Sequence, residues 1–429
     1  MKHVHEFRDP IHKAISVCTD ELNVIDSQPF QRLRHIHQLA LTYLVFPGAT
    51  HKRFEHSIGV MELASRIFDV VTNVANVFDD NVRKVIANED SKRYWKSVLR
   101  MAALCHDLGH LPFSHAAEEL LPDGYDHERL TKDIICSLNM RDIWAATTPP
   151  LRADDIVRLA VGGKVVDAPK LTPWETILTE IITGDAFGAD RIDYLLRDSY
   201  HVGIQCGTFD HLRLINSLRI LPTEYNGTDK LTLGLEAGGL EAAEGLMIAR
   251  HSMYKQIYFH PTRRIYDIHL RDFLKSWLPS GRFSTKLQKH LRMSDAEVLS
   301  AIRKADSEVT SPHHELARRI ERREHFRALY NSSLIDKEDG KFIAGKALAE
   351  AAEKKFGKDA IRYDHIPAVV PASEFPVWHE GKIESSLKLS QTLARMPGIR
   401  IDRIYCKKCV YADAIRWRDD NKRAILGLQ

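Results

Sequence analysis

Apolar residues recur every three or four positions through several long segments of the chain, a spacing that fits one buried face of an α-helix. The clearest runs lie at residues 58–71, 95–105, 177–182, 240–258 and 315–330. The run at 177–182 follows a clear helix start: Thr172 can cap, Pro173 suits the first turn, and Glu175 completes a capping box. The 429 residues include only 22 glycines and 17 prolines, which excludes disorder and fibrous folds for most of the length. The sequence therefore predicts a mainly α fold.

Strand signals are short and few. Leucines alternate with other residues over 231–235, and Asn226-Gly227 before them favours a hairpin turn to a partner near residues 218–221. Residues 16–24 and 399–406 are two further candidate strands. We expect small β-hairpins beside a helical core.

The composition changes near residue 280. Mixed charges become dense beyond that point, and Pro367, Pro371 and Pro376 indicate irregular connections. We expect a core at residues 1–280 and a C-terminal α+β lobe at residues 281–429, packed on the core and available for oligomer contacts.

Charge and composition limit the kinds of partner. The formal net charge of +3 is too mild to require nucleic acid or an anionic membrane. No run of 18 apolar residues occurs, so no membrane span is expected, and the start of the chain has no apolar signal core. Six scattered cysteines do not suggest a disulfide framework. A cytoplasmic protein is the expectation.

Four candidate metal ligands lie on or at the ends of expected helices: His56, the adjacent pair His106-Asp107, and Asp190. Helices are rigid mounts, as a metal site requires. Imidazole with carboxylate favours Mn, Fe, Zn or Ni over a site built only from oxygen. The plain alternative is that His106-Asp107 only closes a helix, with the carboxylate as a cap.

The surroundings of this pair favour function. Residues 105–115 read CHDLGHLPFSH, which places His110 and His115 close behind the pair around a Gly-Pro turn, and His127 follows. A core cannot bury so many polar rings without partners for them. A metal centre with acid–base histidines beside it accounts for the cluster.

Several runs, taken in order, carry a family resemblance: FRDPIH at residues 7–12, IDSQPFQRLR at 25–34, VFPGATHKRFEHS at 45–57, HDLGHLPFSH at 106–115, and DRIDYLLRD at 190–198 with VGI at 202–204. Together they resemble the HD-domain phosphohydrolases, and among these the deoxynucleoside triphosphate (dNTP) triphosphohydrolases. The resemblance covers about residues 5–330. It implies an HD-domain helical core and hydrolysis of a dNTP to a deoxynucleoside and inorganic triphosphate.

The resemblance also implies roles for the cluster. His56, His106, Asp107 and Asp190 would bind a divalent metal, with Mg as a further candidate. His110, His115 and His127 would be catalytic histidines, with His115 facing the leaving 5′ oxygen. Glu118 would be a carboxylate that orients a histidine.

Substrate contacts are implied in the same way. Tyr194 would pack on the sugar C2′, Asp198 would bind the 3′-hydroxyl with Gln38, and Arg191 replaces a family lysine beside the metal-ligand Asp. The remaining expected substrate contacts are Leu39 and Tyr258 around base and sugar, and Arg53 and Arg250 on the phosphates. A tetra-anionic triphosphate requires such cations around it.

Eukaryotic members of the family have a regulatory guanine-nucleotide site at a subunit interface. Asp26, Gln31 and Arg34 match the residues that read the guanine, while His5 stands in place of a phosphate-binding Lys. The resemblance therefore implies a guanine-nucleotide activator and a homo-oligomer, either a dimer or a tetramer. The alternative is that residues 26–34 form a helix start with a surface Gln and Arg.

Two other functions stay open at this point. One is an HD-family nucleotidase or phosphodiesterase that acts on another nucleotide. The other is a protein that binds nucleotides or single-stranded nucleic acid. The sugar-contact residues and the three histidines favour dNTP hydrolysis.

Overall fold

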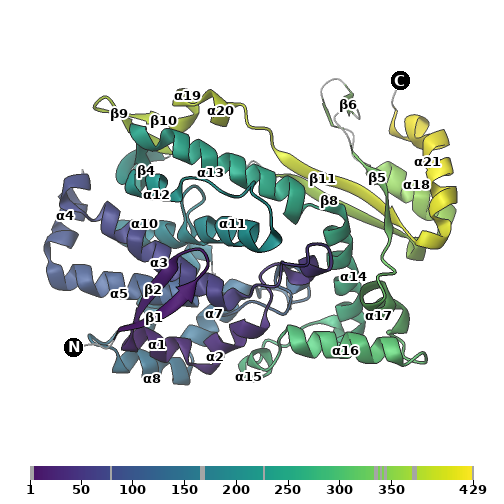
Figure 1. The fold of residues 1–429 in the computed structure, drawn as a ribbon, viewed down its shortest axis with the longest axis horizontal. Helices are drawn as coiled ribbons and strands as arrows, with labels where there is room; N and C mark the ends of the chain where they lie inside the picture. The colour runs from purple at the N-terminus through teal and green to yellow at the C-terminus, as the bar shows by residue number, and fades with distance from the viewer. Residues whose placement is uncertain are drawn as a thin grey trace. The chain divides into compact units, whose positions relative to one another are not determined.

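The structure, a computed structural model, describes residues 4–77, 80–164, 170–225, 228–332, 337–338, 341–342, 345–369 and 374–427. The chain forms two compact units, each built from separate stretches (Figure 1). Unit 1 comprises Met1–Met253, Arg282–Glu297 and Ala372–Met396, and unit 2 comprises Tyr254–Gly281, Val298–Pro371 and Pro397–Gln429. Stretches of the two units alternate along the chain. The domain boundary expected at residue 280 stays a prediction.

Unit 1 is mainly helical. Its helices are α1 (Thr19–Ile25), α2 (Gln28–Gln31), α3 (Arg53–Val71), α4 (Asp80–Ala87), α5 (Glu89–Cys105), α6 (His115–Glu118), α7 (His127–Ile135), α8 (Leu138–Ala146), α9 (Ala153–Val161), α10 (Pro173–Thr183), α11 (Ala189–Val202), α12 (His211–Asn216), α13 (Leu240–Met253), α15 (Leu287–Leu291), α19 (Ser386–Leu389) and α20 (Gln391–Ala394). The first turn of α16 (Asp295–Ser307) also belongs to this unit.

Helix α3 lies at the centre of unit 1. It packs against α5, α10, α11 and α12. Its apolar positions at spacings of three and four, such as Met61, Ala64, Ile67 and Phe68, are fully buried. Burial of such a face, rather than helix propensity, supplies most of the stability of a helix in a protein.

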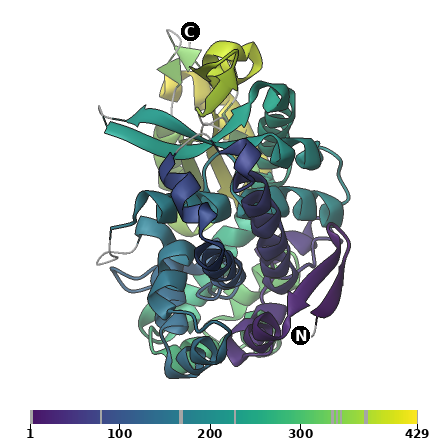
Figure 2. The same cartoon turned by 90° about the vertical axis from the view of Figure 1, so that its left-hand side faces the viewer.

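Two sheets belong to unit 1. The hairpin of β1 (Val4–Asp9) and β2 (Lys13–Cys18) is antiparallel and lies beside the N-terminus in Figure 2. A four-stranded sheet has the order β10-β9-β4-β3, made of β3 (Leu218–Tyr225), β4 (Thr228–Glu236), β9 (Pro376–His379) and β10 (Lys382–Ser385). Strands β4 and β9 pair in parallel and the other neighbours are antiparallel.

Unit 2 combines helices with a three-stranded antiparallel sheet of order β5-β11-β8. Its elements are α14 (Pro261–Trp277), the rest of α16, α17 (His314–Glu321), β5 (Arg327–Asn331), β6 (Lys337–Glu338), β7 (Lys341–Phe342), α18 (Lys346–Phe356), β8 (Ile361–Val369), β11 (Ile399–Cys406) and α21 (Tyr411–Leu426). Shorter turns are the π-helix Tyr254–Tyr258 in this unit and, across the chain, the 3₁₀ segments Arg32–His35, Ala40–Leu44, Val74–Asn76, Gly162–Lys164, Ala237–Gly239, Pro279–Gly281, Lys358–Ala360 and Lys408–Val410.

The predicted mainly α class with small sheets is confirmed. The capping box of α10 is present, since Thr172 Oγ1 accepts from Glu175 N at 3.2 Å and a Glu175 carboxylate oxygen accepts from Thr172 N at 2.7 Å. The predicted strand at residues 399–406 is β11, and the predicted pairing of residues 218–221 with 231–235 is β3 with β4. The predicted turn at Asn226-Gly227 lies outside the described residues.

Two predicted elements are wrong in part. The strand expected at residues 16–24 ends at Cys18, because the Glu21 carboxylate accepts from Cys18 N at 2.9 Å and starts α1. The helix expected over residues 315–330 ends at Glu321, and residues 327–331 form β5 instead. Arg323 has a φ of 57°, which a helix cannot continue through, and β5 then pairs with β11.

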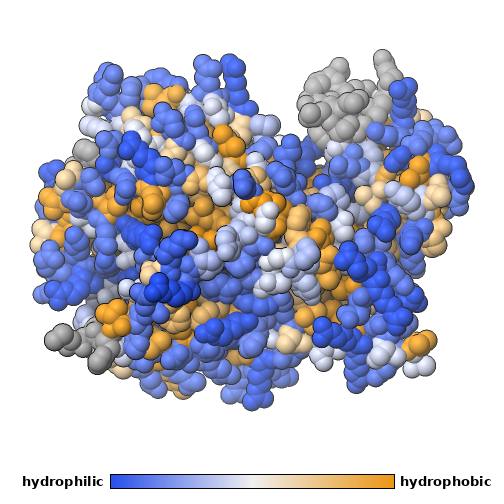
Figure 3. Space-filling view, viewed as in Figure 1, coloured by the Kyte–Doolittle hydropathy of each residue, from blue (hydrophilic) through white to orange (hydrophobic). Residues whose placement is uncertain are grey.

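Hydrophilic side chains cover most of the face drawn in Figure 3, with apolar residues scattered among them. No helix in the described ranges combines the length and apolarity needed to cross a bilayer.

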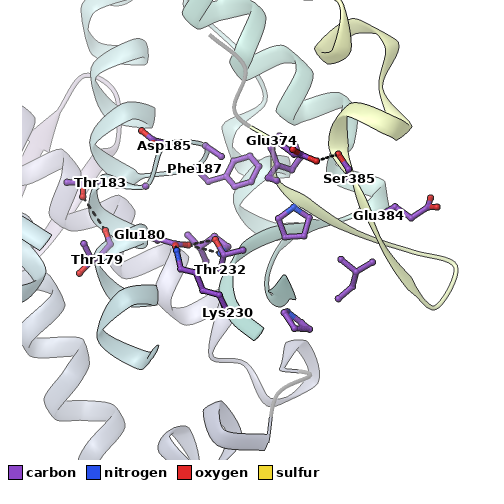
Figure 4. Close-up of a pocket in the computed structure, with 17 residues that line it drawn as sticks. Thr179, Glu180, Thr183, Asp185, Phe187, Lys230, Thr232, Glu374, Glu384 and Ser385 are labelled. Atoms are coloured by element: carbon purple, nitrogen blue, oxygen red, sulfur yellow. Dashed lines mark hydrogen bonds and ion pairs between the residues drawn. The ribbon is translucent and has the colours of Figure 1, made fainter. Parts of the chain in front are cut away.

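A cavity of about 940 Å³ lies beside the four-stranded sheet of unit 1 (Figure 4). Glu180 of α10 lines this cavity and contacts β4. Its carboxylate accepts from Thr232 Oγ1 at 2.6 Å, Leu233 N at 2.9 Å and Lys230 Nζ at 3.3 Å. On the opposite wall Glu374 accepts from Ser385 Oγ. Glu180 thus joins α10 to the sheet, and Glu374 joins the segment before β9 to the end of β10.

Candidate metal centre

Three helices of unit 1 bring the expected metal ligands together. His56 lies in the first turns of α3, which begins where the Glu55 carboxylate accepts from Lys52 N at 2.6 Å. His106 follows the last residue of α5 as its C-cap, and Asp190 lies in the first turn of α11. Helix ends therefore supply ligands from positions far apart in the sequence.

The ligand atoms lie close to one another. One such atom from each of His56, His106 and Asp190 lies within 4.8 Å of the others. His56 Nε2 is 3.0 Å and His106 Nε2 is 3.7 Å from Asp190 Oδ1. The carboxylate of Asp107 lies beside them, 3.7 Å from His56 Nε2 and 3.4 Å from His106 Nε2.

The ring nitrogens fit a metal. His106 Nδ1 donates to the Ala103 carbonyl at 2.8 Å, and His56 Nδ1 faces Asp193 Oδ2 at 2.8 Å. Both hydrogen bonds leave Nε2 as the atom aimed at the carboxylates. Both Nε2 atoms are buried and make no well-formed hydrogen bond. A cation among two imidazoles and two carboxylates would satisfy these atoms, and the donor set suits Mn, Fe, Zn or Ni.

Arg53 places a buried positive charge at this centre. Its guanidinium pairs with Asp107 Oδ2 and donates from Nε to Ser114 Oγ at 2.9 Å. Burial alone would raise the pKa of Asp107, but Arg53, His106 and His110 hold it well below its usual range. Asp107 is therefore a carboxylate at any ordinary pH.

His110 and His127 form a stacked pair next to the ligands. Their ring centroids are 4.1 Å apart with an interplanar angle of 15°. Gly109 permits this approach, because a Cβ there would lie 2.1 Å from the His127 carbonyl oxygen. His110 Nε2 lies 3.1 Å from Asp107 Oδ1, and His127 Nδ1 pairs with Glu118.

The two stacked rings have opposite electrostatic settings. Burial, together with Arg53 and His127, holds the pKa of His110 well below its ordinary value. Burial also lowers the pKa of His127, but its hydrogen bond to Glu118 outweighs this and raises the pKa above 6.5. Their surroundings therefore favour a neutral ring at His110 and a protonated ring at His127.

His115 begins α6, and its side chain lies outside what the structure describes. The turn before it is strained, since Phe113 and Ser114 each have a φ of 57°. Asp295 Oδ1 accepts from Phe113 N at 2.7 Å, and its Oδ2 accepts from His37 N at 2.8 Å. These bonds and the Arg53 contact to Ser114 hold the turn in this conformation.

Three of the expected substrate residues lie on α11. Tyr194 is half-buried and interacts with the half-buried Arg191. Arg191 also donates to the Gly184 carbonyl at 3.3 Å. Asp198 is buried, and its Oδ1 lies 2.7 Å from His51 Nε2.

The other expected substrate residues occupy several places. Gln38 N donates to the His51 carbonyl at 3.0 Å, and Asp198 contacts the His51 ring. Both expected sugar contacts therefore bind His51. Leu39 and Arg250 are buried in unit 1. Tyr258 belongs to unit 2, where it packs on the cluster of Phe259, Ile399 and Ile401.

The residues expected to read a guanine lie on the surface of unit 1. Gln31 Oε1 accepts from Arg34 Nε at 2.9 Å, and the Arg34 guanidinium lies 3.4 Å above the Phe54 ring centroid. Asp26 is exposed at the end of α1, and His5 is exposed on β1. The structure brings Gln31 and Arg34 into direct contact.

Sequence reasoning missed the residues that support the site. Asp193 and His12 lie behind His56, His51 lies behind Asp198, and Asp295 holds the strained turn. Each of these contacts joins residues more than a hundred positions apart. The only signal was that Asp193 falls three residues after Asp190 on one helix.

Two family descriptions match the chain. "HD domain" matches residues 53–162, which contain His56, His106 and Asp107, and "HD associated region" matches residues 209–376. Neither description assigns a substrate.

The chain is similar to several known proteins. It is 34% identical to an uncharacterized protein of Methanocaldococcus jannaschii over 77% of this chain and 60% of that protein, so it spans less than two thirds of that relative. It is 26% identical to the deoxynucleoside triphosphate triphosphohydrolase SAMHD1 of Gallus gallus over 94% of this chain and 72% of that protein. A crystal structure of a hypothetical protein from Aquifex aeolicus superposes with a TM-score of 0.79 at 33% identity, covering 96% and 99% of the two chains.

Proposed function

This chain belongs to the HD-domain family, and from that premise we propose that it hydrolyses dNTPs to a deoxynucleoside and inorganic triphosphate. The main observation behind this proposal is the pair of buried Nε2 atoms on His56 and His106, which face the carboxylates of Asp107 and Asp190. The SAMHD1 relatives are named deoxynucleoside triphosphate triphosphohydrolases and are 26–31% identical to this chain, which supports the choice of substrate.

When bound at this centre, a divalent cation would polarise a phosphoryl oxygen and lower the pKa of a water ligand. Water attacks the α-phosphorus, and the bond between the α-phosphorus and the 5′ oxygen breaks. Arg53, buried and charged beside Asp107, would attract the phosphate oxygens. The leaving 5′ oxygen needs a proton, and an imidazolium is a suitable donor near neutral pH.

The histidines divide that work. We assign proton donation to His115, as the resemblance implies. His127 with Glu118 keeps a positive charge next to His110, which disfavours protonation of the His110 ring. The neutral His110 can then accept a proton or a hydrogen bond from water.

Selection of a deoxyribose rests on α11. Tyr194 and Asp198 are four residues apart, so their side chains share one face of the helix. Asp198 would accept from the 3′-hydroxyl, and the Tyr194 ring against C2′ would exclude a further hydroxyl by overlap and by leaving it without a partner.

We therefore predict that ribonucleoside triphosphates are poor substrates and that Tyr194→Ala narrows the preference for dATP over ATP by about tenfold, the size of roughly 1.4 kcal/mol. The measurement is inorganic triphosphate release from each nucleotide with Mn²⁺ present. Tyr200→Ala, an exposed tyrosine on the same helix, is the matched control. Equal turnover of ATP and dATP by the unmutated protein would move the assignment to an HD nucleotidase of broader range.

We also propose that a guanine nucleotide activates the enzyme at Asp26, Gln31, Arg34 and His5, within a homo-oligomer of a cytoplasmic protein. The contacts of Gln31 support this, because its Oε1 accepts from Arg34 Nε and its Nε2 donates to the carbonyl of Ile25, the residue before the exposed Asp26. Asp can accept from the guanine ring N–H and amine, and Arg can donate to its carbonyl.

Removal of the Arg34 guanidinium tests this site. We expect GTP to raise dATP turnover in the unmutated protein and Arg34→Ala to lose at least about tenfold in apparent GTP affinity, the loss of one charged contact. Arg416→Ala, at an exposed arginine of α21, should respond to GTP as the unmutated protein does. Turnover that is independent of GTP in all three proteins would exclude the activator.

A further inference from the structure

A buried carboxylate behind the metal centre makes four close contacts. Asp193 Oδ2 lies 2.8 Å from His56 Nδ1 and 2.8 Å from Arg197 Nε. Its Oδ1 lies 2.6 Å from His12 Nε2 and 2.9 Å from Arg197 Nη2. Asp193, His56 and Arg197 are all fully buried. This is more contact than an acidic residue needs for solubility or helix formation.

The contact with His56 decides how that ring presents itself. A carboxylate at Nδ1 requires a proton on Nδ1. In the neutral ring the lone pair is then on Nε2, the atom that can bind a metal. Nε2 is the atom that lies 3.0 Å from Asp190 Oδ1. Asp193 therefore fixes both the tautomer and the angle of the ring toward the expected metal.

One partner of Asp193, His12, comes from the N-terminal hairpin. His12 lies in the turn between β1 and β2, and Asp9 ends β1. Asp9 Oδ2 accepts from Arg197 Nη1 at 2.7 Å, while its Oδ1 accepts from His12 N at 2.8 Å. The hairpin turn is thus bound to α11 through both Arg197 and Asp193.

A glycine gives independent support for this arrangement. Gly59 lies on α3 one turn after His56, facing α11. A Cβ at this position would lie 2.1 Å from Asp193 Oδ1 and 2.4 Å from Arg197 Nη2. The backbone of α3 leaves room for the ion pair at this one point.

We propose that Asp193 is a positioning residue of the metal centre, and that His12 and Arg197 hold it so that the N-terminal hairpin completes the support of His56. The proposal rests on the metal centre of the proposed function, but not on its substrate. Carboxylates that hold a metal-binding histidine typically contribute 10–100-fold to metal affinity.

The first test is metal affinity, measured for Mn²⁺ by competition with a chelator. Asp193→Asn should raise the Mn²⁺ dissociation constant by about 10–100-fold. The matched control is Glu175→Gln, which breaks an ion pair at 2.8 Å between a buried carboxylate and the partly exposed Arg158, without contact to a ligand. Unchanged Mn²⁺ affinity in a folded Asp193→Asn protein would overturn the proposal.

A second set of variants covers the case in which Asp193→Asn does not fold. His12→Asn removes one contact of Asp193 and leaves the pair with Arg197, and Gly59→Ala displaces the carboxylate from the side of α3. Both should weaken Mn²⁺ binding by several-fold, His12→Asn less than Gly59→Ala. Wild-type affinity in both folded variants would contradict the role of the hairpin.

A spectroscopic measurement reports on the ring itself. In the metal-free protein, the Nδ1–H of His56 should give a strongly downfield proton resonance, because it donates to a carboxylate. Folded His12→Asn should shift this resonance, and Glu175→Gln should leave it in place. If Mn²⁺ affinity falls as expected while no dNTP is hydrolysed by the unmutated protein, the positioning role stands and the substrate assignment fails. If dNTP hydrolysis is found with no change in affinity, the reverse holds.

Discussion

Asp107→Ala is expected to abolish inorganic triphosphate release and to remove most of the bound metal. Asp107 lies within 3.7 Å of both ligand nitrogens, and Arg53 and two histidines keep it ionised. His106→Ala removes an imidazole from the same centre and should have the same effect. The measurements are triphosphate release from dATP and metal content per chain after gel filtration.

The control must separate metal loss from unfolding. Removing Asp107 leaves the Arg53 guanidinium buried without its carboxylate, which typically costs about 3–5 kcal/mol. Circular dichroism and Tm are therefore measured for each variant. Asp155→Asn, at a buried carboxylate bonded to Tyr94, should retain both metal and activity. Full activity of Asp107→Ala at wild-type metal occupancy would exclude Asp107 as a ligand.

His127→Ala should lower turnover by about 10²–10⁴-fold, the usual range for a lost acid–base group, because it disables His110 as a proton acceptor, while dNTP binding and metal content change little. The reason is the stack on His110: without the imidazolium, His110 loses both its ring partner and the charge that disfavours its protonation. Asp123→Asn, in the same segment and paired only with Arg282 at the surface, is the matched control. Single-turnover kinetics at saturating dATP gives the comparison, and near-normal turnover would place His127 outside the catalytic machinery.

The dependence of turnover on pH should follow the protonation of His127. Because Glu118 raises the pKa of His127, the imidazolium and its contribution to activity and stability are present at low pH and are lost as pH rises through the raised pKa. Glu118→Gln should lower that pKa and move the alkaline limb of the turnover profile to lower pH. An unmoved limb would mean that another group controls it.

Local pattern was sufficient for the elements that carry the ligands. The three- and four-residue spacing predicted the helices of His56 and His106, and Asp190 was placed at the start of a helix. The strand at residues 399–406 was also found, because its alternation and β-branched residues suit a paired strand. These features depend on residues within a few positions of one another.

The support of the site could not be predicted that way. His12 and Asp193 are 181 positions apart, and His37 and Asp295 are 258 positions apart. Nothing in the periodicity of either segment indicates its partner, since the contact depends on how the helices pack. The same limit explains the error at residues 327–331, where pairing with β11 overrides a helical charge pattern.

The strained turn at Phe113 and Ser114 has a consequence for how the protein opens. Left-handed backbone at non-glycine residues costs on the order of 1–3 kcal/mol each, yet neither position can become glycine without losing a contact. The Phe113 ring is fully buried and stacks near His37, and Ser114 Oγ accepts from Arg53. The turn is therefore held by its neighbours against its own preference. In amide hydrogen exchange, the amides of residues 113–117 should exchange well ahead of those of α3 and α5, and binding of a metal or a nucleotide should slow them first.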